Sequence, residues 1–594
     1  MTVEFGRWTL GLDGADAPSR ELIGGKAWSI ASMSALGLNV PPAFVVTTQA
    51  CAFYLAAGAP PEELEDEIAD AVGWLESRTS RSFGGGPRPL LVSVRSGAPI
   101  SMPGMMDTVL NLGMSDDTEE ALAAECGDAT FARDTHRRFL ELYARIVLKV
   151  GEIELDRGGG PMGWRDAIAG STGVPVTADA REQLRGAVRA VFDSWNSRRA
   201  RRYRQHHGIP ESLGTAVTVQ AMAFGNLDDR SGTGVLFSRN PLTGDAQPYG
   251  EYLPRAQGED VVSGRFTPKP LSSLSASLPE VHQELLAAAN KLEGASRDVQ
   301  DIEFTVERGR LYLLQSRAAK LAPHAAVRIA VDLVREGVID EATALQRVTP
   351  DQIRIVLSPR LGESTRNAAE VVAKGEGASP GVGVGTAVLD ADEAEHRARK
   401  GEAIVLARPT TSPEDLHGMI IARAVVTELG GATSHAAVVG RALGLPCVVG
   451  CGAGSLAALV GKTVTVDGQS GEIFAGALPI ESPDENDHDA LMIIGRWAAA
   501  RAPLRVISCS AAAAHDAVDL GSDPAAADPE RIAETLAAYK GARGVRGGAI
   551  ASEQGVRAAI STGLEFIVAD PILPALLAAA RIGSEPRFES KVGA

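Results

Sequence analysis

The stretch LGGATSHAAVVGRALGLPCVVG, residues 429–450, decides how the centre of this sequence folds. Its glycine pair can leave a strand, Thr433 or Ser434 can cap a helix, and Gly444 can end that helix before the next strand. His435 then lies in the first helical turn. Because a helix N-terminus offers free N–H groups and a partial positive charge, it would stabilise a phosphoryl group carried on this imidazole. The stretch therefore predicts a phosphohistidine carrier.

The residues around His435 decide between two interpretations of that side chain. A lone histidine at the start of a helix is more often an ordinary cap or core residue. The string GGATSHAA, residues 430–437, instead resembles the phosphohistidine signature of enzymes that use or make phosphoenolpyruvate. Upstream, RPTTSPEDL, residues 408–416, is similar to the lead-in of their mobile domain. The two strings together favour the functional interpretation, with Gly431, Thr433 and Ser434 forming the phosphohistidine loop.

Length and composition limit the remaining possibilities. A chain of 594 residues should hold several domains, and its net charge of −17 argues against nucleic acid as a partner. No apolar run reaches about 18 residues, so no membrane span is expected. The first residues carry Glu4 and Arg7 where a signal peptide needs an apolar block, which makes the cytoplasm the default location. The five scattered cysteines form no CxxC pair and are expected to be buried free thiols, Cys509 at a strand end among them.

The first third of the sequence contains two candidate phosphate-binding stretches. The Gly-Gly-Lys string ending at Lys26 lacks the spacing of a P-loop, and alone it would indicate only a surface lysine. Residues 91–113 predict a buried strand ending in Arg95, followed by a Gly/Met loop. Arginine binds phosphate oxygens bidentately, and such a loop can close over a triphosphate. The alternative is a strand followed by a structural turn. The basic run of residues 198–204 is expected to form a solvated helix face paired with acids.

Two further segments predict paired strands. Residues 217–224 and 232–241, with a turn between them, predict a hairpin. In residues 300–317, alternation places Asp301 and Glu303 on one face of a strand, and Gln315 and Arg317 on one face of its partner. A carboxylate and an amide oxygen on adjacent strands can share Mg²⁺, and the arginine can reach phosphate. A surface hairpin with cross-strand ion pairs would look the same in isolation.

The string RSGAPISMPGMMDT, residues 95–108, and the segments just described resemble the nucleotide domain of the pyruvate phosphate dikinase family. This resemblance covers roughly residues 20–475 and implies an ATP-grasp fold. It implies that nine residues occupy family positions that contact nucleotide, metal or the transferred phosphate. They are Lys26, Arg95, Gly104, Thr108, Gln220, Asp301, Glu303, Gln315 and Arg317. Among these, it implies Glu303 and Gln315 as metal ligands, and Arg95 and Arg317 as catalytic residues beside His435.

The predicted fold class is multidomain α/β. We expect an ATP-grasp nucleotide-binding domain at residues 1–322, a helical connector at 323–370, and a swivelling β/α phosphohistidine domain at 371–480. The glycine series at 381, 383 and 385 is expected to enter a strand, since no helix follows it. Residues 488–594 are too few for the family's β/α barrel, which needs at least about 200 residues, and predict a short α/β module.

The resemblance implies an ATP-dependent phosphotransferase with Mg²⁺ as cofactor. ATP, with phosphate, would phosphorylate His435, which passes the phosphoryl group to pyruvate or to another acceptor bound elsewhere. In the full family reaction, ATP, phosphate and pyruvate give AMP, diphosphate and phosphoenolpyruvate. The acceptor can lie on a separate acceptor-domain protein, and a homodimer is left open. Two alternatives remain: transfer to a different small molecule, and a non-catalytic nucleotide-sensing scaffold.

Overall fold

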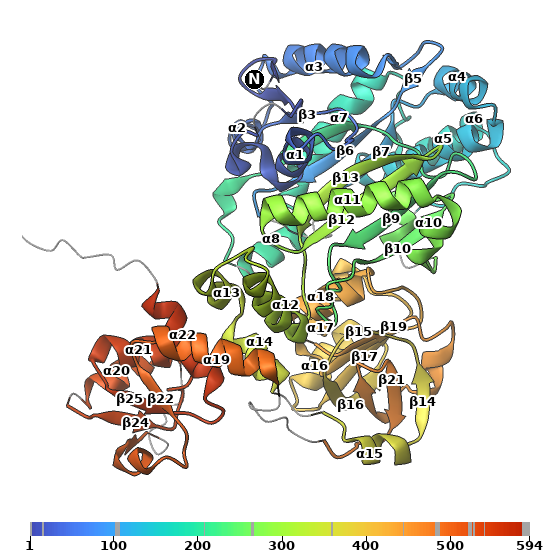
Figure 1. The fold of residues 1–594 in the computed structure, drawn as a ribbon. Coiled ribbons are helices and arrows are strands. Elements are labelled where there is room, and N and C mark those ends of the chain that lie inside the picture. The colour runs from blue at the N-terminus through green and yellow to red at the C-terminus, as the bar shows by residue number, and fades with distance from the viewer. Residues whose placement is uncertain are drawn as a thin grey trace, which may run out of the picture. The chain divides into compact units, whose positions relative to one another are not determined.

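A computed structural model describes most of the chain, and two predicted residues, Gly104 and Gly444, lie outside the described part. The described residues are 3–14, 17–100, 102, 107–151, 153–206, 208–262, 266–357, 360–443, 445–480, 488–520, 526, 529–539 and 541–584. They form two compact units. The first holds residues 1–238, 250–318 and 412–414, and the second holds residues 239–249, 319–411 and 415–594. Figure 1 labels the elements of both units.

The first unit begins with an antiparallel six-stranded sheet. Its strands, in spatial order, are β1 (Val3–Glu4), β2 (Thr9–Gly11), β3 (Ala43–Val46), β8 (Ala216–Ala221), β6 (Val92–Gly97) and β7 (Thr108–Leu112). The helices of its N-terminal part are α1 (Arg20–Ala35), α2 (Thr48–Ala57) and α3 (Leu64–Thr79). Every residue of β3 and β8 is buried, as expected for valine-rich strands covered on both faces. The sheet therefore provides a rigid frame for α1, which carries Lys26.

A second, five-stranded sheet completes this unit. Its spatial order is β11 (Lys269–Pro270), β10 (Tyr249–Pro254), β9 (Gly232–Phe237), β12 (Gln300–Glu307) and β13 (Arg310–Ala318). Helices α10 (Ser272–Ser277) and α11 (Pro279–Ser296) follow β11, and α11 packs against β12 and β13 (Figure 1). A short helix, α9 (Gly258–Val262), precedes β11.

The predicted hairpin of residues 217–224 and 232–241 is wrong, although both strands exist. β8 pairs with β3 and β6 in the first sheet, whereas β9 pairs with β12 in the second. Both strands are buried along their whole length, so each needs hydrogen-bonded neighbours on two sides, and the segment between them crosses from one sheet to the other. The two lobes expected of an ATP-grasp fold are thus joined at this point.

Helices fill the segment between β7 and β8. They are α4 (Asp116–Cys126), α5 (Ala129–Ile146), α6 (Pro161–Thr172), α7 (Ala180–Ser194) and α8 (Arg198–His206). The prediction of a fully solvated basic face on α8 is wrong at Arg204, whose side chain is only 1% exposed. Its guanidinium lies 4.1 Å from the centre of the Trp195 ring, a cation–π arrangement that holds the charge inside the fold. Arg199 behaves as expected and pairs with Asp107.

In the second unit, a helical segment follows β13. Its members are α12 (Pro323–Arg335), α13 (Glu341–Arg347), α14 (Pro350–Val356) and α15 (Glu363–Ala368). The sequence sets their starts: α12 and α14 carry proline in the first turn, and the Thr349 hydroxyl accepts from the N–H of Gln352 in a capping box. The helical character predicted for residues 323–370 is therefore confirmed. Its role as a mobile connector stays a prediction.

An eight-stranded sheet follows. Its order is β14 (Val371–Lys374), β21 (Glu472–Ala475), β20 (Thr463–Asp467), β16 (Val382–Val388), β17 (Ile404–Arg408), β18 (Ala424–Thr427), β19 (Cys447–Val449) and β15 (Glu376–Ser379). Strands β16 to β19 run parallel, with α16 (Ala391–Ala398), α17 (Leu416–Ile421) and α18 (His435–Leu443) between them. As predicted, the glycine series enters a strand: Gly381 directly precedes β16, and Gly383 and Gly385 lie within it. A Cβ on Gly383 would approach Arg423 O to 2.1 Å, so this strand position requires glycine.

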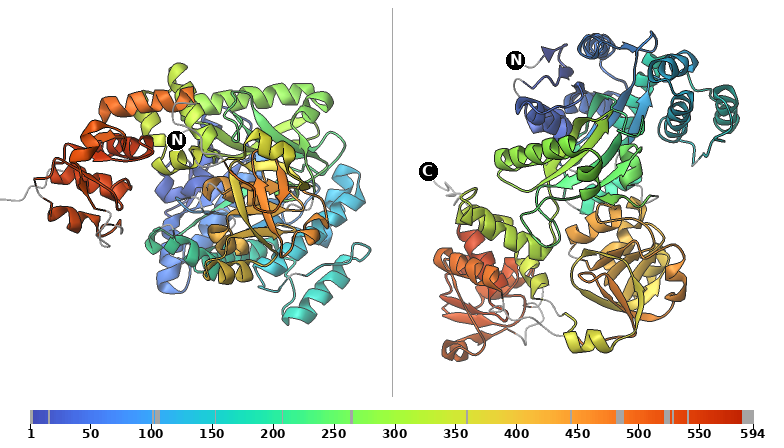
Figure 2. Two further views of the ribbon diagram at one scale, coloured as in Figure 1. Left: turned by 90° about the horizontal axis from the view of Figure 1, so that it is seen from below. Right: turned by 45° about the vertical axis from the view of Figure 1, so that its right-hand side comes forward.

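The last described residues form a small parallel sheet of order β22 (Arg505–Ile507), β25 (Phe566–Val568), β24 (Gly544–Arg546) and β23 (Val518–Asp519). Its helices are α19 (Asp489–Arg501), α20 (Ile532–Ala537), α21 (Glu553–Thr562) and α22 (Leu573–Gly583), and α19 packs against α22 (Figure 2). Cys509 follows β22 as expected, but it is exposed rather than buried. In the described part of the chain, every helix is too short or too polar to cross a membrane.

We expect Gly24→Ala to lower the free energy of unfolding by about 3 kcal/mol. Gly24 interrupts α1 with φ 74° and ψ 165°, and a Cβ there would lie 1.8 Å from Gly97 O. Gly73→Ala in α3 is the matched control, because its Cβ would meet nothing within 4 Å and alanine should stabilise that helix by about 1 kcal/mol. Chemical denaturation measures both. Equal stability of the two variants would contradict this explanation of the Gly-Gly string.

Candidate functional site

Two carboxylates and their partners lie on one face of the β12–β13 pair, as alternation predicts. Asp301 lies directly opposite Arg317, and Glu303 directly opposite Gln315. Opposite residues of an antiparallel pair project to the same side of the sheet. Arg317 Nε donates a 2.8 Å hydrogen bond to Asp301 Oδ2, which lies on a side chain that is almost fully buried. The prediction that these four residues lie together is confirmed.

Arg95, from β6 of the first sheet, joins this group. Its Nη2 donates to Glu303 Oε2 at 3.1 Å and to Gln315 Oε1 at 3.2 Å. Because one nitrogen reaches both oxygens, the two oxygens are close enough to hold a single cation between them. A carboxylate and an amide oxygen so arranged are a donor set that suits Mg²⁺. The side chain of Arg95 is 14% exposed, so its charge is only weakly screened by water.

Lys26 is the third cation of the cluster. Burial, and after it the charge of Arg95, lower the pKa of Lys26 to about 7, although Glu303 acts in the opposite direction. Burial also acts to raise the pKa of Glu303, but Arg95, Arg317 and Lys26 together hold it below its usual value. Among the described residues, Lys26, Arg95 and Arg317 thus face two carboxylates, Asp301 and Glu303. The cluster has a surplus of positive charge when Lys26 is protonated, and a polyanion would complete it.

The other predicted residues of the nucleotide site take different positions. Thr108 in β7 lies directly opposite Arg95 and shares its face of the sheet. Gln220 is buried and donates its side-chain amide to Pro41 O at 3.2 Å, so that donor is already used within the fold. Sequence reasoning missed Thr218, which also lies opposite Arg95 and whose buried hydroxyl has no hydrogen-bond partner among the described residues. Its alternation with Gln220 was the signal that could have found it.

The phosphohistidine loop of the second unit has the predicted geometry. His435 is the first residue of α18, and Ser434 precedes it as the cap, with its Oγ accepting from Ala437 N at 3.5 Å. Gly430 adopts φ 102°, a left-handed conformation that turns the chain into the loop. Thr433 and Ser434 are both buried. The loop is therefore shaped by the glycine and the capping residue.

The imidazole of His435 is held neutral. Burial lowers its pKa to about 4, against a smaller upward effect of the Asp415 carboxylate. His435 Nδ1 lies 3.2 Å from the Thr411 hydroxyl, and the described residues supply no hydrogen bond to Nε2. If Nδ1 carries the proton and donates it to Thr411, Nε2 keeps its lone pair. A neutral imidazole with a free lone pair is the form that acts as a nucleophile.

Two supporting contacts of this loop were not predicted. Arg441 of α18 is buried and donates from Nη1 to Ala432 O at 2.9 Å and to Ala378 O at 3.1 Å, which fixes the loop from behind. Arg408 Nε lies 3.2 Å from Asp415 Oδ1. The lead-in string that contains Arg408 and Asp415 was recognised in the sequence, but its contact with the loop requires the parallel pairing of β17 with β18.

The cationic cluster around Arg95 and the loop before His435 define the class of this protein. It is a multidomain α/β chain in which one unit holds two sheets and the cationic cluster, and another presents a histidine at the start of a helix. Residues 54–273 match the family model "Pyruvate phosphate dikinase, AMP/ATP-binding domain", and residues 400–471 match "PEP-utilising enzyme, mobile domain". The predicted relationship is therefore confirmed. The chain contains one segment similar to the AMP/ATP-binding domain of pyruvate phosphate dikinase and one similar to the mobile domain of PEP-utilising enzymes.

Curated relatives agree with these matches. A pyruvate, phosphate dikinase of Rhizobium meliloti (strain 1021) is 42% identical over 79% of this chain and 57% of its own length. One of Clostridium symbiosum is 40% identical over 83% of this chain and 60% of its own. A chloroplastic pyruvate, phosphate dikinase 1 of Zea mays is 42% identical over 78% and 53%. The chain thus spans little more than half the length of these relatives.

We expect His435 to remain neutral well below the pH at which an exposed histidine titrates. Because its pKa is about 4 in the fold and about 6.5 in an unfolded chain, the unfolded state binds more protons between these values. Stability should therefore fall as the pH falls from 6.5 to 4, and His435→Gln should lessen this loss. NMR of the imidazole, assigned with that variant, measures the pKa directly. Titration near 6.5 would contradict the assignment.

Proposed function

We propose that this chain is an ATP-dependent phosphotransferase in which His435 carries the phosphoryl group. The observation that carries the proposal is the convergence of Lys26, Arg95 and Arg317 on the Glu303 carboxylate, in a unit whose residues 54–273 match the AMP/ATP-binding family model. The neutral His435 at a helix start, in a matched mobile domain, supplies the acceptor nitrogen. Its swivelling between two sites is part of the proposal.

On the nucleotide side, the proposed role of this chain is to position phosphoryl groups and offset their charge. Arg95 presents a planar guanidinium that can bind phosphate oxygens, and Arg317, held by Asp301, adds a second one. Glu303 Oε2 and Gln315 Oε1 would hold Mg²⁺, which when bound neutralises charge on the nucleotide phosphates. Thr108 and Thr218 lie on the same face as Arg95 and can donate to phosphate oxygens. Gly104 and Gln220 remain proposed ligands from the family resemblance.

On the histidine side, Thr411 holds Nδ1 so that Nε2 is the attacking atom. The Nε2 atom of His435 would attack the β-phosphorus of ATP, so that an N–P bond forms as the anhydride bond to AMP breaks. Phosphate would then take the γ-phosphoryl group and leave as diphosphate, which breaks the β–γ bond and leaves phospho-His435. The loop around Gly431, Thr433 and Ser434 and the start of α18 would stabilise the phosphoryl group through backbone and hydroxyl donors. Catalysis would then consist mainly of positioning and electrostatic stabilisation.

For the final acceptor we propose pyruvate, giving phosphoenolpyruvate and unmodified His435. The support is the printed name of the relatives, pyruvate, phosphate dikinase, together with the match to the mobile domain of PEP-utilising enzymes. The pyruvate would bind elsewhere than in the two groups described above. The fate of the label in the experiment below, with and without pyruvate, distinguishes this acceptor from others.

We expect wild-type protein mixed with Mg²⁺, phosphate and ATP labelled in its β- and γ-phosphoryl groups to gain an acid-labile, base-stable label. His435→Ala should reduce that label at least about 100-fold, because the nucleophile is lost. The control is His396→Ala, which removes an exposed histidine of the same sheet domain. Absence of label on the wild type would favour a nucleotide-sensing scaffold. Loss of label on adding pyruvate, with release of phosphoenolpyruvate, would support the proposed acceptor.

We expect the affinity for Mg-ATP to fall as the pH rises from 7 to 9, by up to about tenfold per pH unit. The reason is that free Lys26, with a pKa of about 7, loses its charge in this range, whereas the bound polyphosphate favours the charged form. Lys26→Arg keeps the charge and should flatten the profile. Lys320→Arg, at an exposed lysine just after β13, is the matched control. Calorimetric titrations measure all three, and an unchanged slope in Lys26→Arg would contradict this role.

A further inference from the structure

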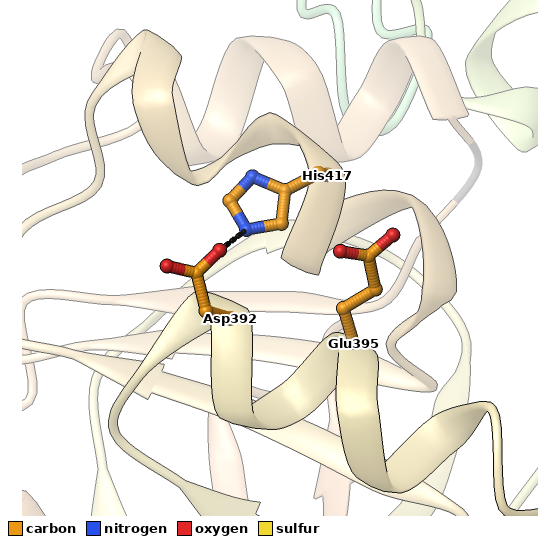
Figure 3. A group of neighbouring side chains, drawn as sticks. All are labelled: Asp392, Glu395 and His417. Carbon is orange, nitrogen blue, oxygen red and sulfur yellow. Dashed lines mark ion pairs between the residues drawn. The ribbon is translucent and has the colours of Figure 1, made fainter.

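Outside the phosphoryl-transfer residues, three metal-ligating side chains gather on the surface of the eight-stranded sheet domain. Asp392 and Glu395 lie one helical turn apart on α16, and His417 lies on α17 (Figure 3). His417 Nε2 is 3.0 Å from Asp392 Oδ1. One ligand atom from each residue lies within 4.8 Å of the other two. A single ion therefore needs only small side-chain adjustments to contact all three.

The two helices that present these side chains are packed tightly. A Cβ on Gly418, the residue after His417, would lie 2.9 Å from Ala391 Cα and 2.8 Å from its Cβ. Only glycine thus lets the backbone of α17 approach α16 this closely. Ala394 and Met419 are fully buried beneath the pair. The ligands consequently project from rigid elements rather than from loops, which is what a preformed metal site needs.

The ring nitrogen of His417 provides a second, independent observation. Nε2 is shielded from solvent and lies 3.0 Å from Oδ1 of Asp392, so a proton or a metal ion has to lie between these two atoms. A cation shared by Nε2 and the carboxylate would satisfy both atoms. Glu395 also pairs with Arg399, at 2.6 Å, through one of its oxygens.

We propose that Asp392, Glu395 and His417 bind one divalent transition-metal ion of the Zn²⁺ class. One imidazole nitrogen and two carboxylate oxygens suit Zn²⁺ or Co²⁺, whereas Mg²⁺ prefers oxygen ligands alone. Water would complete the coordination, since Asp392 is 91% exposed. The ion would clamp α16 to α17 and so stabilise the domain that carries His435. This inference is independent of the proposed phosphotransfer, because none of its ligands belongs to the two groups described above.

The test is a titration of the full chain with Co²⁺, followed by its visible absorption, and displacement by Zn²⁺. We expect one strongly bound equivalent in the wild type and at least a tenfold weaker affinity in His417→Ala and in Asp392→Asn. His396→Ala removes a neighbouring exposed imidazole of α16 and should leave the affinity unchanged. Unchanged affinity in both ligand variants, or loss of the spectrum in His435→Ala instead, would overturn the proposal.

A second measurement guards against variants that merely unfold. Zn²⁺ should raise the thermal midpoint of the wild type and of His396→Ala, since a ligand that binds only the folded state stabilises it. Asp392→Asn changes an exposed side chain, so its midpoint without metal should match the wild type, and Zn²⁺ should raise it much less. An equal rise in Asp392→Asn, or a rise caused equally by Mg²⁺, would contradict a transition-metal site at these residues.

Discussion

The contacts of the Arg95 guanidinium are the interaction on which the nucleotide-binding unit depends. One nitrogen from a strand of the first sheet reaches Glu303 and Gln315 on neighbouring strands of the second. Buried charges are costly unless they are paired, so this contact compensates the carboxylate while it holds the two lobes in register. Removing Arg95 would leave Glu303 without its nearest cation, and removing Glu303 would leave three cations facing each other with Asp301 alone.

Burial lowers the pKa of both Lys26 and His435, with a different consequence for each proposed role. In the nucleotide unit it brings the pKa of Lys26 to about 7, where a bound polyanion can restore the charge. At the phosphohistidine loop it keeps His435 neutral, and Thr411 holds one ring nitrogen. A charged lysine stabilises phosphate and a neutral histidine attacks it, so a low-polarity environment serves both proposed tasks. The chemistry thus depends on how deeply each side chain is buried.

The sequence predicted features whose determinants are local. Alternation placed Asp301, Glu303, Gln315 and Arg317 on one face, and the Gly-Ser pattern placed His435 at a helix start. The predictions failed where contacts between residues far apart in the sequence decide the structure. Two fully buried strands, residues 216–221 and 232–237, carry no sign of which sheet they join, and the expected hairpin was wrong. Stacking on Trp195 buries Arg204 against its local pattern, and the contact of Thr411 with His435 spans 24 residues. Domain boundaries and ligand roles stay predictions.

The most direct test is a rapid-mixing experiment with stoichiometric protein, Mg-ATP and phosphate, without pyruvate. If His435 takes a phosphoryl group from a nucleotide held by Lys26, Arg95 and Arg317, a burst of one AMP and one diphosphate per protein molecule should appear and then stop. His435→Ala should show no burst. ADP as the product, continued turnover without an acceptor, or an AMP burst that survives in His435→Ala would contradict the account.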